Sequence, residues 1–442
     1  MLLEFRLDNF KSYWFPQVFS MRPEFGGKAL ESSIIKLSRE GEDRGLEALC
    51  SSVICGSNGS GKSNLLIALS NFRDLILAGN MNFDRSRSLT DYIYSPLKWA
   101  PRASETDVKP IVLGIAFVAN DLKIDYEIHI EVGKYLESDY QRKVVYEKLQ
   151  VNDEAAFERK EHQITINQNS FTVKNSSSSQ ECSLLEINEK SNRSLKQDEP
   201  FLCHGFNTIV NPDLAAVIIN WFKNDLKIMA GPRTWISLRW FDISFKAPLL
   251  EVFQCAADSI RPSFTDFTFI PEEGENEFRC LLNRIYKQDG SRLTVQTDIY
   301  ESQGTYEFTE FFTHILEALV TGSTLLVDDL DGHLDPRIVL SLLDLFHNKD
   351  LNKFGAQFIF TTRNPLFFDD EHVRPDEMKI SVSFQAETTF IYSISALLNN
   401  KDFKGSKDNN YVKNYLRGEY TGRKILLEEM TLKLLKEEEK ER

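Results

Sequence analysis

The sequence predicts an α/β fold, and three observations indicate it. A short apolar run at 52–55 precedes a glycine-rich loop, and residues 64–72 then carry apolar side chains at helical spacing. Short runs between 111 and 166, most of them rich in Val, Ile, Phe and Tyr, are separated by turn residues, which is typical of an antiparallel sheet. Residues 324–327 and 357–361 are continuous apolar runs of the buried-strand type, with a helical pattern at 338–346 between them.

The glycine-rich loop fits the pattern G-x-x-x-x-G-K-[ST] of a phosphate-binding loop, and it comprises Gly56, Ser57, Asn58, Gly59, Ser60, Gly61, Lys62 and Ser63, followed by Asn64. Its glycines permit backbone angles that turn successive N–H groups towards one anionic group. The lysine supplies a mobile charge for the outer phosphates, and the last serine is placed to ligate magnesium. A simple Gly/Ser turn needs neither the Lys-Ser pair nor the fixed glycine spacing. The loop therefore predicts a site for a nucleoside triphosphate.

Composition narrows the class of protein. The chain has 442 residues, a net charge of −14 and a hydrophobic fraction of 42%, which is ordinary for a globular protein. An acidic surface repels phosphate backbones, so avid nonspecific DNA binding is not expected. The overall negative charge is still compatible with a local basic groove. The N-terminus is charged too early for a signal peptide, and no apolar run reaches the roughly 18 residues of a membrane span. We expect a cytoplasmic protein without a membrane partner.

The six cysteines are scattered, without a C-x-x-C pair or a histidine at metal-ligand spacing. This pattern favours small buried hydrophobic side chains in a reducing compartment over a zinc site.

The remaining elements follow from periodicity. Residues 2–7 and 15–21 predict a hairpin, 23–47 a loop or irregular edge, and 175–180 a polar loop tip. A helical pattern covers 213–260, including 215–226 and 247–257, and strands separated by turns are expected within 264–297. Further helices are predicted at 308–320 and at the charged end, 425–442.

A second group of polar residues ends the apolar run 324–327. Asp328 would hold magnesium, and Asp329 would orient or deprotonate the attacking water, as a P-loop ATPase requires. Upstream, Ser302 and Gly304 form a Ser-x-Gly turn before the predicted helix at 308. This turn is either a second anion site at a helix N-terminus or a simple helix cap.

The order of these motifs resembles that of ABC-type ATPases, and more narrowly the AAA-family ATPases of bacterial abortive-infection and overcoming-lysogenisation-defect proteins. The matching motifs run nearly end to end: Asn9-Phe10-Lys11-Ser12, the phosphate loop, Ser302-Gln303-Gly304-Thr305, the acidic strand, His333-Leu334-Asp335-Pro336 and Thr361-Thr362-Arg363. The resemblance implies ATP and Mg2+ as ligands, with Asn9, Lys11 and Ser12 also contacting ATP. It implies a mixed central sheet, an antiparallel β lobe and an inserted helical and mixed subdomain.

The resemblance divides the chain into four parts. The N-terminal half of the ATPase domain would span 1–170, the inserted subdomain 171–300, the C-terminal half 301–400 and a helical tail 401–442. It also implies a homodimer or higher homo-oligomer in which Lys62 faces Ser302 and Gly304 of the other protomer, with Asp335 near the junction.

Two residues depart from the family pattern. Asp329 stands where the family usually has Glu, and Arg363 stands where it usually has a His that senses the γ-phosphate. The shorter carboxylate reaches the water less well, and an arginine cannot shuttle a proton. We therefore expect all three catalytic candidates, Asp328, Asp329 and Arg363, to support only slow hydrolysis.

The tail from 367 lacks the carboxylate cluster of a Toprim-type nuclease, because residues 369–371 read as a solvated turn. The sequence thus predicts an ATPase subunit similar to those of AbiL- or PARIS-type phage defence, which would respond to a phage-encoded trigger and control a separate nuclease or toxin. The alternative is a DNA-maintenance ATPase similar to recombination and SMC proteins, although sustained heptads are lacking. A transporter ATPase would need membrane-domain partners and usually has a shorter chain.

Overall fold

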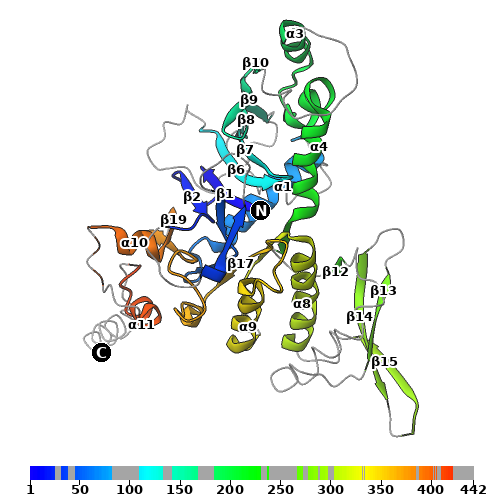
Figure 1. Ribbon diagram of the computed structural model, residues 1–442, viewed down its shortest axis with the longest axis vertical. Coiled ribbons are helices and arrows are strands. Elements are labelled where there is room, and N and C mark those ends of the chain that lie inside the picture. Colours follow the sequence, from blue (N-terminus) through cyan, green and yellow to red (C-terminus); the bar gives the residue numbers. More distant parts are fainter. Residues whose placement is uncertain are drawn as a thin grey trace, which may run out of the picture.

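The structure is a computed structural model (Figure 1). It describes residues 1–24, 31–37, 45–81, 109–132, 142–167, 184–229, 236–237, 266–271, 277–286, 289–296, 303–330, 332, 334–384, 388–401, 403, 405 and 410–421.

A six-stranded sheet forms the centre of the molecule, in the order β11-β16-β17-β5-β18-β19. All neighbours are parallel except β18 and β19, which form an antiparallel pair at one edge. The strands are β5 (Ser51–Cys55), β11 (Leu226–Met229), β16 (Thr324–Val327), β17 (Gln357–Thr362), β18 (Met378–Phe384) and β19 (Thr388–Ser393).

The two faces of this sheet pack into different cores, as the alternation of side chains along a strand requires. Ile54, Leu326 and Ile359 belong to one core, which includes helix α1 (Lys62–Ala78) and the antiparallel lobe. Their neighbours along the same strands belong to the other core, with helices α8 (Gln303–Thr321) and α9 (Pro336–His347). Covering both faces explains why these strands read as unbroken apolar runs.

The antiparallel lobe is a seven-stranded sheet in the order β10-β9-β8-β7-β6-β1-β2 (Figure 1). Its strands are β1 (Leu2–Asp8), β2 (Gln17–Ser20), β6 (Ile111–Ala119), β7 (Leu122–Glu131), β8 (Lys143–Val151), β9 (Glu154–Lys160) and β10 (Gln163–Ile166). The Gln357 side chain joins the two sheets, because it accepts from the Leu2 N–H at 2.6 Å and donates to the Leu2 carbonyl at 2.9 Å.

Helical segments cover the lobe and lead back to the central sheet. They are α3 (Leu184–Ser194), α4 (Pro212–Asn220) and the π-helical segments η3 (Leu202–Val210) and η4 (Trp221–Asp225). Trp221 stacks on Phe117 with 3.9 Å between ring centroids, and both side chains are buried. This contact fixes η4 against the lobe directly before β11 enters the central sheet.

An arm of strands projects at the lower right of Figure 1, formed by β12 (Ile236–Ser237), β13 (Asp266–Pro271), β14 (Glu277–Tyr286) and β15 (Arg292–Gln296). The remaining elements are short: η1 (Glu31–Ser33), β3 (Ile34–Leu37), β4 (Leu46–Leu49), η6 (Pro365–Phe367), α10 (Ile394–Asn399) and α11 (Tyr411–Leu416). None of the helices in the described part of the chain combines the length and hydrophobicity that a membrane span requires.

The predicted fold class is confirmed: an α/β P-loop fold with a mixed central sheet and an antiparallel lobe. Some details of the prediction were wrong. Strands β11 and β12 interrupt the helical pattern expected over 213–260, and helix α8 begins at Gln303 rather than near 308. Strand β3 lies within 23–47, and β4 begins at the end of that range. Strands β18 and β19, which were not predicted individually, belong to the central sheet and lie beyond 367. The predictions for 175–180, 247–257 and 425–442 lie outside the described residues.

Candidate nucleotide-binding site

The site lies where three parallel strands end side by side. In the strand register Val327 pairs with Phe360, and Thr362 pairs with Cys55. The segments that follow β16, β17 and β5 therefore leave the sheet together at the carboxyl ends of these strands. Ligands bind at this position in open α/β sheets. This places the acidic pair after Val327, Arg363 after Thr362 and the phosphate loop after Cys55 beside one another.

The loop between β5 and α1 has the geometry that its glycines predict. Gly59 and Gly61 have φ values of 74° and 94°, which favour glycine. Ser57, Asn58, Gly59 and Ser63 are exposed, whereas Gly56 and Ser60 are buried beneath them. These exposed residues leave the backbone of the loop accessible to a ligand. The first turn of α1 adds the positive end of the helix dipole.

Lys62 is held inside this loop. Its Nζ donates to the carbonyl oxygens of Gly56 at 2.6 Å and Ser57 at 3.0 Å, and the residue is 8% exposed. Burial lowers the pKa of Lys62; the charge of Arg363 lowers it as well, while Asp329 and Asp328 act in the opposite direction. The charged groups at the three strand ends thus act on one ammonium group.

Residues from distant parts of the chain support the phosphate loop by hydrogen bonds. The Ser60 carbonyl lies 2.8 Å from Ser381 Oγ on β18 and 3.0 Å from Thr389 Oγ1 on β19. Ser12 Oγ lies 2.8 Å from Thr389 Oγ1 and accepts from Asn64 Nδ2 at 2.8 Å. The N-terminal Asn-Phe-Lys-Ser turn and the strand pair β18–β19 therefore stabilise the position of the phosphate loop.

At the end of β16, Thr361 organises both carboxylates. Its hydroxyl donates to Asp328 Oδ1 at 2.5 Å and accepts the backbone N–H of Asp329 at 2.8 Å. Asp329 has a φ of 51°, a left-handed conformation that a non-glycine residue rarely adopts. The turn after β16 is thus fixed by a buried hydroxyl on the neighbouring strand.

The two residues that depart from the family pattern contact each other. The Arg363 guanidinium donates to an Asp329 carboxylate oxygen and forms an ion pair with it, and both side chains are partly exposed. The Arg363 guanidinium therefore orients the Asp329 carboxylate.

The oxygen donors at the site fit magnesium. Ser63 offers an exposed hydroxyl in the first turn of α1, and Asp328 offers a half-buried carboxylate. Mg2+ prefers such hard oxygen ligands, and it is usually held by one or two protein oxygens together with substrate phosphates.

The other predicted site residues have different surroundings. Asn9 donates from Nδ2 to the Lys109 carbonyl at 2.6 Å. Lys11 has a φ of 48°, and its Nζ lies 6.0 Å from the Phe10 ring centroid. Asp335 caps α9 and pairs with Arg337 at 2.7 Å, which holds its pKa at about 2. Gly304 lies in the first turn of α8, and Ser302 lies outside the described residues.

Ser381 and Thr389 were not predicted from the sequence as site residues, and Thr361 was recognised only as part of a motif. The alternation of Met378, Ile380 and Val382 along β18 was a signal that could have revealed this strand. The contacts of Ser381 and Thr389 to the loop depend on the fold alone.

Comparison with known proteins gives one family match. Residues 220–369 match the model of a family described as "AAA domain, putative AbiEii toxin, Type IV TA system". This match supports an AAA-type ATPase domain; it includes Asp328, Asp329 and Arg363 but not the phosphate loop. No curated protein matches the chain.

Among solved structures, the chain is similar to the SMC head domain from Thermotoga maritima. The TM-score is 0.35 and the identity 14%, over 89% of this chain and 98% of that chain.

Proposed function

We propose that the protein is an ATPase that binds ATP with Mg2+ at the loop 56–63 and hydrolyses it slowly. The observation that carries the proposal is the convergence of the loop with Asp328 and Asp329 at one edge of the central sheet. The AAA-type match over 220–369 supports it independently of the loop.

Each residue has a role in this proposal. Lys62 exchanges the loop carbonyls for the outer phosphates of ATP, and the loop N–H groups bind the same oxygens. Ser63 and Asp328 would hold Mg2+, which supplies charge neutralisation at the phosphates. Thr361 keeps the Asp328 carboxylate in place.

Slow hydrolysis follows from the ion pair of Asp329 with Arg363. A carboxylate engaged by arginine is a weaker general base, because the neighbouring cation stabilises its charged form. Arg363 would also contact the γ-phosphate as a fixed cation while it stays paired with Asp329, which would orient the water. ATP binding then acts mainly as a conformational clamp.

Calorimetric titration of ATP tests the binding site. Lys62→Ala should abolish measurable ATP binding, whereas Lys196→Ala, which alters an exposed lysine on the lobe, should leave it unchanged. Equal affinities in the two variants would contradict the proposal. A turnover number well above roughly 10 per second would contradict slow hydrolysis.

We further propose that the ATP site is completed by a second copy of the chain. The support is the Ser-x-Gly sequence at the start of α8, a helix N-terminus suited to an anion, together with the resemblance described above. Gly304→Trp should abolish ATP hydrolysis while ATP binding is retained. Unchanged turnover in this variant would exclude the composite site.

The biological role that we propose is a cytoplasmic sensor or scaffold subunit of a bacterial anti-phage system that controls a separate toxic effector. The support is the sequence resemblance together with the match to the family described as "AAA domain, putative AbiEii toxin, Type IV TA system". A neighbouring gene for a Toprim-like nuclease, whose toxicity depends on this chain, would support the role. ATP-dependent, salt-sensitive DNA binding by the purified protein would instead favour a DNA-maintenance ATPase.

A further inference from the structure

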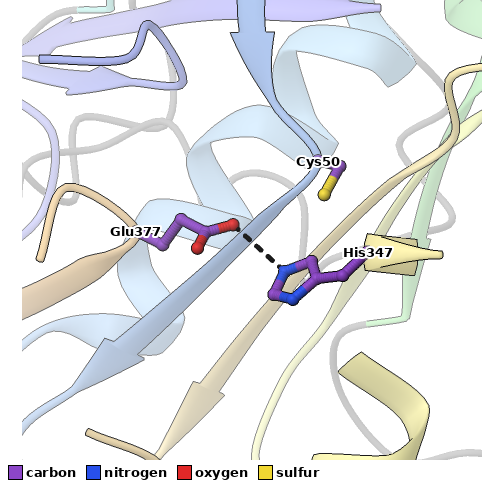
Figure 2. A group of neighbouring side chains, drawn as sticks. All are labelled: Cys50, His347 and Glu377. Carbon is purple, nitrogen blue, oxygen red and sulfur yellow. Dashed lines mark hydrogen bonds and ion pairs between the residues drawn. The ribbon is translucent and has the colours of Figure 1, made fainter. Parts of the chain in front are cut away.

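A second group of reactive side chains lies at the opposite edge of the central sheet from the phosphate loop. Cys50 directly precedes β5, Glu377 directly precedes β18, and His347 is the last residue of α9. Their side chains point towards one another in Figure 2. Because β5 and β18 are parallel neighbours, the residues that precede them meet at the amino ends of the strands.

The distances within this group suit a tetrahedral metal site. One potential ligand atom from each residue lies within 4.8 Å of the others. His347 Nε2 and Glu377 Oε1 are 3.2 Å apart. Ligand bonds of roughly 2.0–2.1 Å at tetrahedral angles require about 3.3 Å between a nitrogen and an oxygen ligand, so two of the ligands need almost no movement.

A fourth potential ligand atom, the hydroxyl oxygen of Ser51, lies beside these three. Ser51 Oγ is 3.0 Å from His347 Nε2 and donates to Glu377 Oε1 at 2.8 Å. The other carboxylate oxygen, Oε2, accepts the backbone N–H of Arg374 at 2.9 Å. A hydrogen bond of this kind orients a ligating carboxylate from the second coordination shell.

The burial and chemistry of the group narrow the class of ion. Cys50, His347 and Glu377 are 1%, 6% and 0% exposed. A thiolate, a neutral imidazole and a carboxylate form a mixed S, N and O set that suits Zn2+ and disfavours the hard cations Mg2+ and Ca2+. The two negative ligands would balance the charge of a divalent ion, which a buried site requires.

We propose that Cys50, His347 and Glu377 bind a single zinc ion, with the Ser51 hydroxyl in the fourth position. The ion would join the strand that leads into the phosphate loop, the end of α9 and the start of β18. Its role is structural, because every ligand is buried and lies at the sheet edge opposite the loop.

Metal binding at this site requires that the Cys50 thiol lose its proton. Burial and the nearby Glu377 carboxylate raise the pKa of the Cys50 thiol, while Arg374 and Lys349 act in the opposite direction. Zinc must therefore displace the thiol proton. The alternative is that the group remains a hydrogen-bonded polar cluster in which the cysteine is a small buried side chain.

The test is metal analysis of the full-length chain expressed with zinc and, separately, with cobalt. The wild-type protein should retain about one zinc per chain after gel filtration, and the cobalt form should show a sulfur-to-cobalt charge-transfer band. Cys50→Ser should lose both the metal and the band. Cys203→Ser is the matched control, because this half-buried thiol on η3 donates to the Ile76 carbonyl instead, and it should retain both.

A second measurement covers the case in which Cys50→Ser does not fold. Removal of zinc by a chelator should lower the Tm of the wild-type protein and leave that of His347→Gln unchanged. A wild-type protein without stoichiometric metal, or a charge-transfer band that persists in folded Cys50→Ser, would overturn the proposal. ATP binding is measured on the same samples, so failure of the zinc site is distinguishable from failure of the nucleotide site.

Discussion

The hydroxyl of Thr361 holds Asp328 in place, since it donates to Asp328 Oδ1 at 2.5 Å from the neighbouring strand. The same oxygen accepts the N–H of Asp329 at 2.8 Å, so one buried side chain determines the direction of both carboxylates. The positions of Asp328 and Asp329 therefore depend on the neighbouring strand β17 as well as on β16.

Thr361→Val should reduce ATP turnover at least about tenfold, because an unanchored carboxylate is misplaced relative to the phosphates. It should also lower the free energy of unfolding by about 1–3 kcal/mol, since the half-buried Asp328 carboxylate loses its hydrogen-bond donor. Thr324→Val is the control: it removes a buried hydroxyl that donates to Gln357 at the other end of the sheet. We expect a similar loss of stability from the control in urea unfolding and normal turnover. Normal turnover in Thr361→Val would refute this role.

Gly61 and Gly59 should respond differently to substitution by alanine. A Cβ on Gly61 would lie 2.2 Å from Thr389 Oγ1 and 2.9 Å from Ser12 Oγ, whereas a Cβ on Gly59 meets nothing within 4 Å. Gly59→Ala therefore carries only the conformational cost of a positive φ, about 1–2 kcal/mol. Gly61→Ala should lose more stability than this and most of its ATP affinity.

The double variant Gly61→Ala with Thr389→Ala checks the cause of this difference. It removes the nearest contact, so part of the lost stability in chemical unfolding and part of the ATP affinity in calorimetry should return. Identical losses in Gly61→Ala and Gly59→Ala would show that contact with β19 is unimportant.

Replacing the Asp329–Arg363 ion pair by the Glu and His that are usual in the ATPases that the sequence resembles should accelerate hydrolysis. Asp329→Glu combined with Arg363→His extends the carboxylate by one methylene and supplies a side chain that can transfer a proton. We expect turnover to rise by up to about 100-fold in a phosphate-release assay, within the range of general-base effects. Asp329→Asn should abolish turnover and retain ATP binding. A double variant no faster than wild type would mean that another step limits the reaction.

His372 should make the stability of the C-terminal half depend on pH. Its hydrogen bond to Asp344 raises the pKa of His372 above the ordinary value of 6.5, with Asp369 and Glu371 contributing in the same direction. The stabilisation is therefore fully present below the ordinary pKa and is lost as the pH rises through the pKa of the folded state. Because the pair is partly exposed, its contribution should stay below about 1 kcal/mol.

His372→Gln checks this sign. The variant should be less stable than wild type in mildly acidic buffer and equally stable in alkaline buffer, as measured by urea unfolding. Asp344→Asn should remove most of the same pH dependence. A deficit that grows with increasing pH would contradict the assignment.

Local features of the sequence predicted much of the architecture. The phosphate loop is a short segment whose glycines, lysine and serine act through their own backbone and first helical turn, so the pattern and its neighbours suffice to identify it. The five strands between 111 and 166 were recognisable because each pairs with its neighbour along the chain and turn residues separate most of them. The predicted homodimer, effector and trigger stay predictions.

The boundaries that were wrong have a physical explanation. Leu226–Met229 continues the apolar pattern of α4 and η4, and it becomes a strand because it pairs with β16, far along the chain. Strand pairing over such separations overrides local periodicity. Gln303 begins α8 earlier than its apolar side chains indicate, because polar residues in a first helical turn carry no periodic signal.

By itself, the sequence determined that this chain has a phosphate-binding loop followed by a helix, an acidic strand end and alternating β segments, because these patterns express local backbone preferences and side-chain periodicity. Only the tertiary structure decided that Thr361 orients the acidic pair, that Ser381 and Thr389 support the loop, and that Cys50, His347 and Glu377 meet in one buried group. The order and register of the strands bring these residues together, and those depend on burying both faces of the central sheet at once.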